Sequence, residues 1–402
     1  MKKLEKSVPV IRFKGFSEAW EQRKVSDYAI NTYGGGTPKT NVPEYWSGEI
    51  PWIQSSDVLI SNLFNVIPKK YITELAVKSS ATKFIPANSI AIVSRVGVGK
   101  LVFMPFEYTT SQDFLSLSNL QVDSNFGVYS IYMMLQKELK NIQGTSIKGI
   151  TKTDLLEKHI NKPSSREEQK KIGGFFKQLD DTIALHQRKL DTLKLIKKGF
   201  LQQMFPKSEE DVPKIRFTDF DGKWRQRKLG DVFNERSERS ADGELISVTI
   251  NSGVIKASKL EKKDNSSFDK SNYKVVKKGD IAYNSMRMWQ GASGYSFYDG
   301  ILSPAYTVIY PRKDINALFI AYMFKKIDML QTFQRNSQGL TSDTWNLKFP
   351  SLSTIKIKIP ANDEQIKITN LFQKLEYTSI LHQNRIEMLK KVKKAYLQTM
   401  FI

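Results

Sequence analysis

Residues 167–205 read EEQKKIGGFFKQLDDTIALHQRKLDTLKLIKKGFLQQMF, and residues 363–401 repeat them as DEQIKITNLFQKLEYTSILHQNRIEMLKKVKKAYLQTMF, with 18 of 39 positions identical. In both copies apolar positions recur alternately four and three residues apart, the period of a coiled-coil seam. The first seam comprises Ile172, Phe176, Leu179, Ile183, His186, Leu190, Leu193, Lys197, Phe200 and Met204. The second comprises Ile368, Phe372, Leu375, Ser379, His382, Ile386, Leu389, Lys393, Tyr396 and Met400. The repeat predicts two long helices that pack on each other, antiparallel because the halves are related by an approximate two-fold axis.

Residues at the ends of these stretches support the helices. Ser165 followed by Glu168 predicts a capping box, and Pro206 ends the first helix because proline cannot continue the hydrogen-bond ladder. Asn362 is placed to cap the second helix. A helix of this length is roughly 55 Å long. We therefore expect a spacer that sets a distance; the alternative is a hairpin that only adds stability.

His186 and His382 occupy equivalent seam positions, each within Leu-His-Gln. Two histidines could hold a metal or act as a base. A polar seam pair that fixes the register of the two helices is the interpretation we favour.

A second repeat opens each half of the chain. Residues 8–29 (VPVIRFKGFSEAWEQRKVSDYA) align with 212–233 (VPKIRFTDFDGKWRQRKLGDVF), with 11 of 22 positions identical. The inserts between the repeats, about 30–162 and 234–358, show no such match. A duplicated frame around two unlike inserts predicts one scaffold that presents two different recognition surfaces.

Composition and charge narrow the class of partner. Lys and Arg number 62 against 41 Asp and Glu, which gives a formal net charge of +21. A surplus of this size indicates a polyanionic partner, nucleic acid first and anionic lipid second. The alternative is a basic protein whose charge serves only solubility. The chain has no run of eighteen apolar residues and its start lacks the apolar segment of a secretory signal. The absence of cysteine excludes disulfides and fits a reducing compartment, so we expect a cytoplasmic protein without membrane contact.

Both inserts are predicted to be mainly strands with some helix, which gives an α+β fold with two α/β recognition domains. In the first, 89–104 predicts two strands around a glycine-rich turn and 131–142 predicts a helix. In the second, 277–288, 303–311 and 354–360 predict strands, and 316–333 predicts a helix. The predicted strands and helix follow in the same order in both inserts, which suggests that the inserts share a fold although their sequences differ.

Polar and aromatic residues in the predicted turns are the candidates for reading bases, because their donors and acceptors match base edges in the major groove. Those in the first insert are Lys39, Thr40, Tyr45, Trp46, Ser94, Arg95, Lys100, Gln112 and Lys148. Those in the second are Asn284, Arg287, Trp289, Gln290, Arg335, Asn336, Gln338 and Thr341.

The chain lacks the motifs of an enzyme. VGVGK (96–100) is followed by Leu101, so it is not a Walker A loop, and a predicted strand after it excludes a dinucleotide fingerprint. A nuclease-like pattern can be assembled from Asp242, Glu261 and Lys263 only within a polar, lysine-rich stretch. There is no Cys/His metal cluster and no Asn-Pro-Pro-Tyr motif of amino-methyltransferases. We therefore expect a reader with no catalytic residues and no metal.

The order of these parts resembles the specificity subunit of type I restriction–modification systems. The resemblance is carried by Pro163 with Glu168–Gln169, by Pro360 with Glu364–Gln365, by VPVIRF with Trp20 and VPKIRF with Trp224, and by GGTPKT (35–40), Tyr45–Trp46 and IPWI (50–53). It implies target recognition domains at 1–163 and 207–360 and spacer helices at 164–206 and 361–402. Each recognition domain would read one half of an asymmetric, bipartite double-stranded DNA target.

The resemblance also implies partners that do the chemistry. Two modification subunits would bind S-adenosylmethionine and methylate adenine N6, and restriction subunits would use ATP and Mg to cleave unmodified DNA. This chain itself would bind no cofactor. Two alternatives stay open: a stand-alone DNA-binding regulator with a coiled-coil spacer, and a structural coiled-coil protein.

Overall fold

A computed structural model describes residues 8–60, 62–141, 149–207, 209–260 and 267–402. The chain divides into two compact units: unit 1 is Met1–Gln187 with Asn384–Ile402, and unit 2 is Arg188–Gln383. Both divisions fall inside long helices, so each helix contributes one part to each unit. The division predicted from the sequence, with recognition domains at 1–163 and 207–360 and long helices at 164–206 and 361–402, separates helices from domains and stays a prediction.

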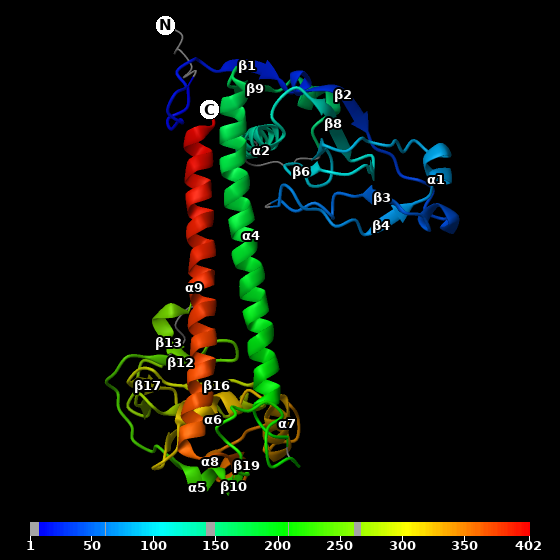
Figure 1. The fold of residues 1–402 in the computed structure, drawn as a ribbon. Coiled ribbons are helices and arrows are strands. Elements are labelled where there is room, and N and C mark those ends of the chain that lie inside the picture. The colour runs from blue at the N-terminus through cyan, green and yellow to red at the C-terminus, as the bar shows by residue number, and fades with distance from the viewer. Residues whose placement is uncertain (1–7, 61, 142–148, 208, 261–266) are drawn as a thin grey trace. The chain divides into compact units, whose positions relative to one another are not determined.

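The two long helices are α4 (Arg166–Gln203) and α9 (Asn362–Met400), which confirms the helical prediction to within two residues at each end (Figure 1). All twenty seam positions are buried or half-buried. In unit 1 Asp180 of α4 pairs with Lys393 of α9, and the Phe175 ring meets the Tyr396 ring. In unit 2 Lys197 pairs with Glu376. Residue numbers rise along α4 as those of their partners fall along α9, so the contacts are antiparallel within each unit.

The predicted helix caps are only partly right. The Ser165 hydroxyl accepts a hydrogen bond from the Glu168 amide at 3.3 Å, which is one half of a capping box. The other half is missing because the Glu168 carboxylate accepts from Arg12 instead. Asn362 is the first helical residue of α9 and lies inside the helix rather than at its cap.

Unit 1 builds its insert from short strands and helices. Its strands are β1 (Glu21–Lys24), β2 (Ala29–Gly34), β3 (Ile50–Ile53), β4 (Lys70–Ile72), β5 (Ser89–Val93), β6 (Leu101–Met104), β7 (Thr109–Thr110), β8 (Phe114–Leu120) and β9 (His159–Lys162). Its helices are η1 (Val25–Tyr28), η2 (Pro43–Trp46), α1 (Glu74–Lys78), α2 (Ser124–Asn141) and α3 (Lys152–Glu157).

Unit 2 is likewise built from short strands and helices. Its strands are β10 (Arg225–Lys228), β11 (Phe233–Glu235), β12 (Ile246–Thr249), β13 (Gly253–Lys256), β14 (Lys274–Val276), β15 (Ile281–Asn284), β16 (Ser293–Tyr295), β17 (Gly300–Leu302), β18 (Tyr306–Pro311) and β19 (Lys356–Ile359). Its helices are α5 (Leu229–Val232), η3 (Ala257–Lys259), η4 (Met288–Gln290), α6 (Ala317–Met323), α7 (Ile327–Asn336) and α8 (Phe349–Ser353).

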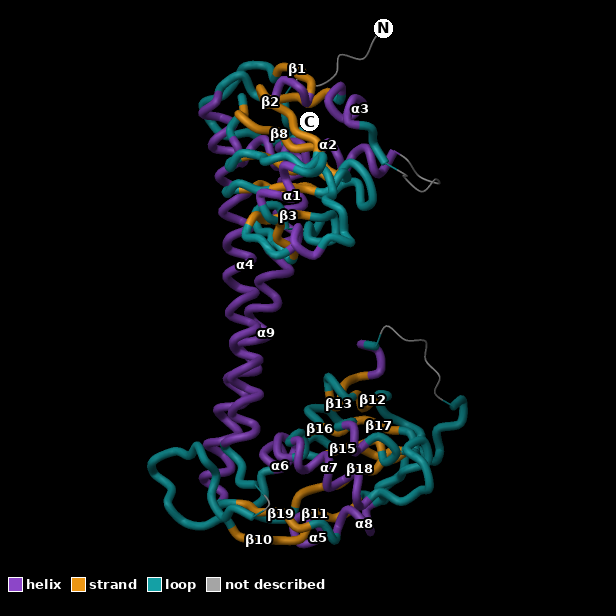
Figure 2. Tube along the Cα trace, turned by 90° about the vertical axis from the view of Figure 1, so that its right-hand side faces the viewer, coloured by secondary structure: helices purple, strands orange, loops and turns teal. Residues whose placement is uncertain are grey.

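The two inserts share the topology of their central sheet. Unit 1 has a four-stranded antiparallel sheet in the order β2-β8-β5-β6, and unit 2 has the corresponding sheet in the order β11-β18-β15-β16. Figure 2 labels the four strands of the unit 2 sheet. A two-stranded ribbon closes each unit, β1 with β9 and β10 with β19. The expected shared fold is confirmed, as are the strands predicted within 89–104.

The remaining strands differ between the units. Unit 1 adds a three-stranded sheet, β4-β3-β7, whereas unit 2 adds the separate pairs β12-β13 and β14-β17. The helix predicted at 316–333 is also interrupted, since α6 ends at Met323 and α7 begins at Ile327. Lys326 has extended backbone and its ammonium donates to the Pro206 carbonyl at 2.7 Å, so a long-range contact replaces a turn of helix.

Each insert packs its helix on the long helices through equivalent aromatic rings. In unit 1 Phe126 of α2 meets Phe401, which also meets Phe176 of α4. In unit 2 Phe319 of α6 meets Phe205, which meets Phe372 of α9. Burying rings of this size supplies much of the apolar contact of each core. The insert is thereby fixed to the helices within its own unit.

Candidate nucleic-acid interface

A buried carboxylate anchors the opening segment of each unit. Glu168 accepts from Arg12 Nε at 2.7 Å, from Arg12 Nη2 at 2.8 Å and from Trp20 Nε1 at 3.3 Å. Its side chain is 1% exposed, and hydrogen bonding to it raises the pKa of Arg12. A planar guanidinium that binds both carboxylate oxygens fixes orientation as well as distance.

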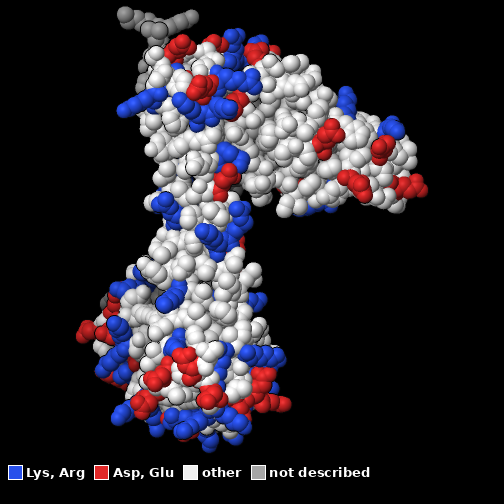
Figure 3. Space-filling model, in the orientation of Figure 1, with Lys and Arg blue, Asp and Glu red and all other residues white. Residues whose placement is uncertain are grey.

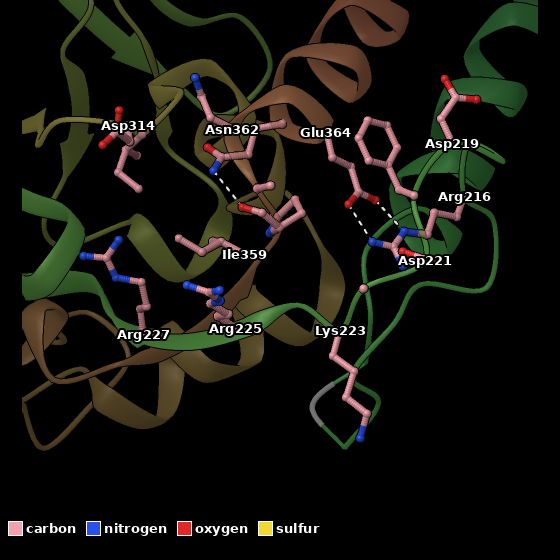
Figure 4. Close-up of a pocket in the computed structure, with 16 residues that line it drawn as sticks. Arg216, Asp219, Asp221, Lys223, Arg225, Arg227, Asp314, Ile359, Asn362 and Glu364 are labelled. Carbon is pink, nitrogen blue, oxygen red and sulfur yellow. Dashed lines mark hydrogen bonds and ion pairs between the residues drawn. The ribbon is translucent and has the colours of Figure 1, made fainter.

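Unit 2 repeats this anchor with the equivalent residues. Glu364 accepts from Arg216 at 2.7 Å through both Nε and Nη2, and from Trp224 Nε1 at 3.3 Å. Figure 4 shows Arg216 turned to Glu364 at a cavity that Arg225 and Arg227 of β10 also line. The Arg, Trp and Glu of the repeated frame are therefore one constellation built twice.

The glutamine after each anchor joins the insert to the start of the long helix. Gln169 donates to the Pro163 carbonyl at 2.8 Å and accepts from the Asp123 amide at 3.0 Å, just before α2. Gln365 donates to the Pro360 carbonyl at 3.0 Å and accepts from the Asn316 amide at 3.0 Å, just before α6. This explains why proline and Glu-Gln recur together in both copies.

A third repeated contact ties each insert helix to both long helices. In unit 1 the Tyr129 hydroxyl donates to Asp180 at 2.6 Å, and Lys393 donates to the same carboxylate at 2.5 Å. In unit 2 Tyr322 and Lys197 donate to Glu376 at 2.8 and 2.6 Å. Burial, followed by the nearby negative charge, raises the pKa of Tyr129 and of Tyr322.

The candidate interface is the loop that follows the matched strand in each sheet. In unit 1 the Ser94 carbonyl, directly after β5, accepts from the Ile150 amide at 2.9 Å. In unit 2 the Ser285 carbonyl, directly after β15, accepts from the Leu347 amide at 2.8 Å. Both loops thus lie against a segment that follows the insert helix, and most of the predicted base-reading residues are on these loops and segments.

The loop after β5 is held from several sides. The Ser94 hydroxyl donates to the Asp113 carbonyl at 3.0 Å and Ser94 is 2% exposed, so it fixes the loop rather than facing solvent. Lys100 donates to the Ser55 carbonyl at 3.0 Å. Arg95 and Gln112 are exposed beside it. Lys148 lies outside the described residues, as do Glu261 and Lys263.

The other predicted residues of unit 1 gather around η2. The Trp46 indole donates to the Lys39 carbonyl at 3.1 Å, and its ring meets that of Trp52 edge-on at 5.0 Å. Lys70 lies over both rings. Lys39 and Thr40 are exposed and Tyr45 is half-buried. The tryptophan rings hold this loop in shape and leave its polar residues accessible.

In unit 2 the predicted residues lie on two adjoining loops and on α7. The Trp289 ring meets the Trp345 ring at 5.1 Å, and Arg287 donates to Gln290 at 3.2 Å. Asn284 accepts from the Met286 amide at 3.0 Å. The remaining positions are further hydrogen-bonded within this group: Arg335 and Asn336 to Thr332, Gln338 to Ser351, and Thr341 with Thr344.

A left-handed glycine ends each of these loops and is held by the insert helix or the turn after it. Gln136 donates to the Gly99 carbonyl at 3.3 Å in unit 1. Lys325 donates to the Gly291 carbonyl at 2.5 Å and to the Ser293 carbonyl at 2.8 Å in unit 2. Burial, and to a smaller extent the charge of Lys197, lowers the pKa of Lys325 to about 8.

Sequence reasoning missed three cations next to the predicted residues: Lys83, Lys152 and Lys325. Lys83 and Arg95 come close enough to Lys152 to repel its charge only in the fold, and Lys325 interrupts what the sequence predicts as a helix. The run Gly34–Gly36 was the available signal for the first two, because three glycines in a row indicate close backbone packing.

Charge on the visible face of each unit is mixed in sign. Figure 3 shows Lys and Arg interspersed with Asp and Glu over the β1–β9 part of unit 1 and over unit 2. The outer part of unit 1, near α1, β3 and β4, shows several Asp and Glu side chains with a few Lys or Arg at its edge, and the surface between it and the long helices is mainly uncharged on this face.

The residues that the structure describes also lack a metal cluster and a membrane-spanning helix. They hold no group of three or more Asp, Glu or His side chains that could bind a metal ion. No helix among them has the length and apolar character needed to cross a membrane.

Comparison with solved structures and curated proteins gives consistent results. The fold matches the S subunit of a type I restriction–modification system from M. genitalium with a TM-score of 0.62 and 15% identity, over 98% of this chain and 99% of that one. A type I restriction enzyme specificity subunit of Methanocaldococcus jannaschii is 30% identical over 237 residues, and one of Escherichia coli is 35% identical over 154 residues. These two alignments span 55% and 34% of this chain and 53% and 36% of the relatives' own lengths.

The family assignment rests on a match that includes both halves. The type I restriction modification DNA specificity domain matches at residues 17–195 and again at 221–391, which together make up most of the chain. Each match contains one Trp–Glu anchor, one four-stranded sheet and most of one long helix. With its frame duplicated in sequence and in contacts, this chain belongs to the type I restriction modification DNA specificity domain family.

Proposed function

We propose that this chain is the DNA-specificity subunit of a type I restriction–modification complex, in which each unit reads one half of an asymmetric bipartite target. The observation that carries the proposal is that the same contacts hold both inserts, whereas the loops that the inserts present differ. The anchors at Glu168 and Glu364 agree atom for atom, whereas the loops after β5 and β15 share little sequence. A frame that holds two different loops in the same place suits the reading of two different half-sites.

The physical division of labour follows from nucleic-acid recognition in general. A net charge of +21 supplies affinity through counterion release, which carries no sequence information. Side chains such as Arg287, Gln290 and Gln112 supply selectivity for the DNA sequence, because their donors and acceptors match base edges. The chain would act without catalytic residues of its own.

The long helices complete the proposal. They would set the distance between half-sites and dock two modification subunits, one on each copy of the frame. S-adenosylmethionine would bind to those partners, and ATP and Mg to restriction subunits. The equivalence of the Asp180–Lys393 and Glu376–Lys197 contacts supports two equivalent docking positions.

The test is to exchange one insert. Residues 30–162 are replaced by the first insert of another family member, the variant is expressed with its modification subunits, and methylated adenines are mapped across the genome. We expect one half-site to change and the other to stay. A change in both halves would refute modular reading, and failure of the unaltered chain to direct any adenine methylation would favour a stand-alone regulator.

A further inference from the structure

The triple glycine of unit 1 brings three segments of the chain to one place. A Cβ atom on Gly34 would lie 2.2 Å from Lys152 Nζ, and one on Gly35 would lie 2.0 Å from the Ser111 carbonyl oxygen. A Cβ on Gly36 would lie 2.5 Å from the Ala81 carbonyl carbon. The contacts at Gly35 and Gly36 are with backbone atoms and are shorter than real Cβ contacts, so these two positions require glycine, whereas the contact at Gly34 is with the end of a lysine side chain.

These approaches position cations next to one another. Lys83 follows the Ala81–Thr82 segment that lies on Gly36. Lys152 begins α3 and places its ammonium on Gly34. Arg95 lies against Gly149, three residues before Lys152, with its Cγ atom 3.6 Å from the Cβ position. The Thr37 hydroxyl donates to Gln112, which fixes that exposed amide at the same edge.

The three cations lack acidic partners among the described residues. None of Lys83, Arg95 and Lys152 forms a salt bridge with a described carboxylate, whereas many other lysines and arginines of the described residues do. Asp113, whose backbone carbonyl accepts from Arg95, directs its carboxylate to the Ser111 hydroxyl instead. Burial, and then repulsion from Arg95 and Lys83, lowers the pKa of Lys152. Positive charges held together at an energetic cost indicate a site for an anion.

Unit 2 does not repeat this arrangement. Its strand β11 corresponds to β2 and ends at Glu235, which pairs with Lys274 at 3.4 Å. Arg236 follows and pairs with Asp280 at 2.6 Å. Lys274 and Arg236 are therefore paired within the protein. Counted from the equivalent contacts of Ser94 with Ile150 and of Ser285 with Leu347, Arg95 and Lys152 correspond to Met286 and Phe349, which carry no charge. The arrangement of Arg95 and Lys152 is thus specific to unit 1.

We propose that Lys83, Arg95 and Lys152 form a phosphate-binding site for one backbone phosphate of the DNA, next to the base-reading loop of unit 1. This deepens the proposed function and rests on it. Gln112 adjoins the site and Arg95 joins it to the loop after β5, so a phosphate held there would set the register in which the loop meets the base pairs. Lys152 brings its charge to this place with its side chain half-buried and its ammonium against Gly34.

The test compares Lys152→Gln with Lys78→Gln, a control on α1 whose exposed lysine pairs with Glu74. Binding of the purified 402-residue chain to target DNA is measured from low to high salt. We expect K152Q to reduce the slope of log affinity against log salt by about one, with equal loss on target and altered sequences, because each neutralised phosphate contributes about 0.9. K78Q should keep the wild-type slope, and Lys152→Arg should restore it.

A second measurement locates the phosphate. Single neutral methylphosphonates are placed along the half-site, and one position should weaken wild type but leave K152Q unaffected. The exposed Arg95→Gln serves where K152Q fails to fold. An unchanged slope in a folded variant, or loss at a single base pair only, overturns the phosphate site. Absence of any sequence preference in the wild-type chain instead refutes the proposed function.

Discussion

Glu168 shows how one buried carboxylate can hold an opening segment that lies far from it in sequence. Arg12 and Trp20 are 156 and 148 residues away from it, and both donate to its carboxylate. Because Glu168 is 1% exposed, removing it would leave a largely buried guanidinium without its counter-charge. The duplication of this contact at Glu364 means that both units depend on the same chemistry.

We expect Glu168→Ala to destabilise unit 1 by about 3–5 kcal/mol, the usual effect of removing one partner of a buried ion pair. The neighbouring Glu167→Ala is the matched control, since Glu167 is 73% exposed and its contact with Lys171 is 3.7 Å. That control should change stability by less than about 0.5 kcal/mol. Urea denaturation measures both, and equal effects of the two variants would contradict the anchor.

Lys325 gives a prediction with a pH dependence. Its pKa is about 8 in the folded chain against 10.5 in a free lysine. Between pH 8 and 10.5 the unfolded chain therefore binds more protons, so the lysine's contribution to stability rises with pH in that window and is constant below it. The difference in unfolding free energy between wild type and Lys325→Met should grow from pH 8 to 10.

At pH 7 the same variant should lose about 1–3 kcal/mol, because the carbonyls of Gly291 and Ser293 lose their donor. Thermal unfolding followed across the pH range measures both effects. A difference between wild type and variant that stays constant from pH 7 to 10 would show that this amine does not titrate as expected.

The helices and the central strands could be predicted because their signals are local. The period of 3.5 residues identifies α4 and α9, and apolar runs identify β5, β6 and β18. The break between α6 and α7 could not be predicted, since it depends on the Pro206 carbonyl, 120 residues away from Lys326. The short strands of β4-β3-β7 and β12-β13 also depend on distant partners.

Residues of the candidate site could likewise be predicted only where their signal is local. Trp289 and Gln290 could be selected because they follow the strand predicted at 277–288, and Arg287 because it lies at the end of that strand. The neighbours Lys83 and Lys152 could not, because the packing on Gly34 and Gly36 that brings them together is invisible to spacing rules. Ser94 was selected for its polarity, and the fold uses that polarity to bind the Asp113 carbonyl.

The ion pairs between α4 and α9 should differ in strength between the units. Asp180 and Lys393 are 20% and 14% exposed, whereas Glu376 and Lys197 are 37% and 36% exposed. Solvent screens the second pair more. A double-mutant cycle should give about 1–3 kcal/mol for Asp180→Asn with Lys393→Met, and less for the pair in unit 2.

The exposed pair Glu74–Lys78 on α1 is the control for these cycles, with an expected coupling of about 0.3–0.5 kcal/mol. Chemical denaturation of the four variants in each cycle measures the coupling energies. If all three cycles give the same value, the buried pair does not contribute specially to the contact between the helices.

The repeat has a consequence for how one chain can recognise an asymmetric target. The Arg–Trp–Glu anchors, the glutamine contacts and the ion pairs of the long helices are equivalent in the two units, so both inserts are held in the same way. The loops differ, and a phosphate site is proposed for unit 1 alone, so the two units would bind different DNA sequences. A near-symmetric frame can bind two copies of one partner, and asymmetry of the target then comes entirely from the inserts. Under this proposal, the distance between half-sites depends on the long helices.

Lengthening both helices tests that dependence directly. Gln187 and Gln383 are equivalent under the repeat, so seven residues that continue the seam are inserted after each. One heptad adds about 10 Å of helix, or about three base pairs of DNA. We expect the variant to methylate a target whose half-sites are unchanged and whose gap is about three base pairs longer. Insertion into only one helix should abolish activity, because the seams no longer match, and an unaltered gap after the double insertion would refute the role of the helices as the spacer.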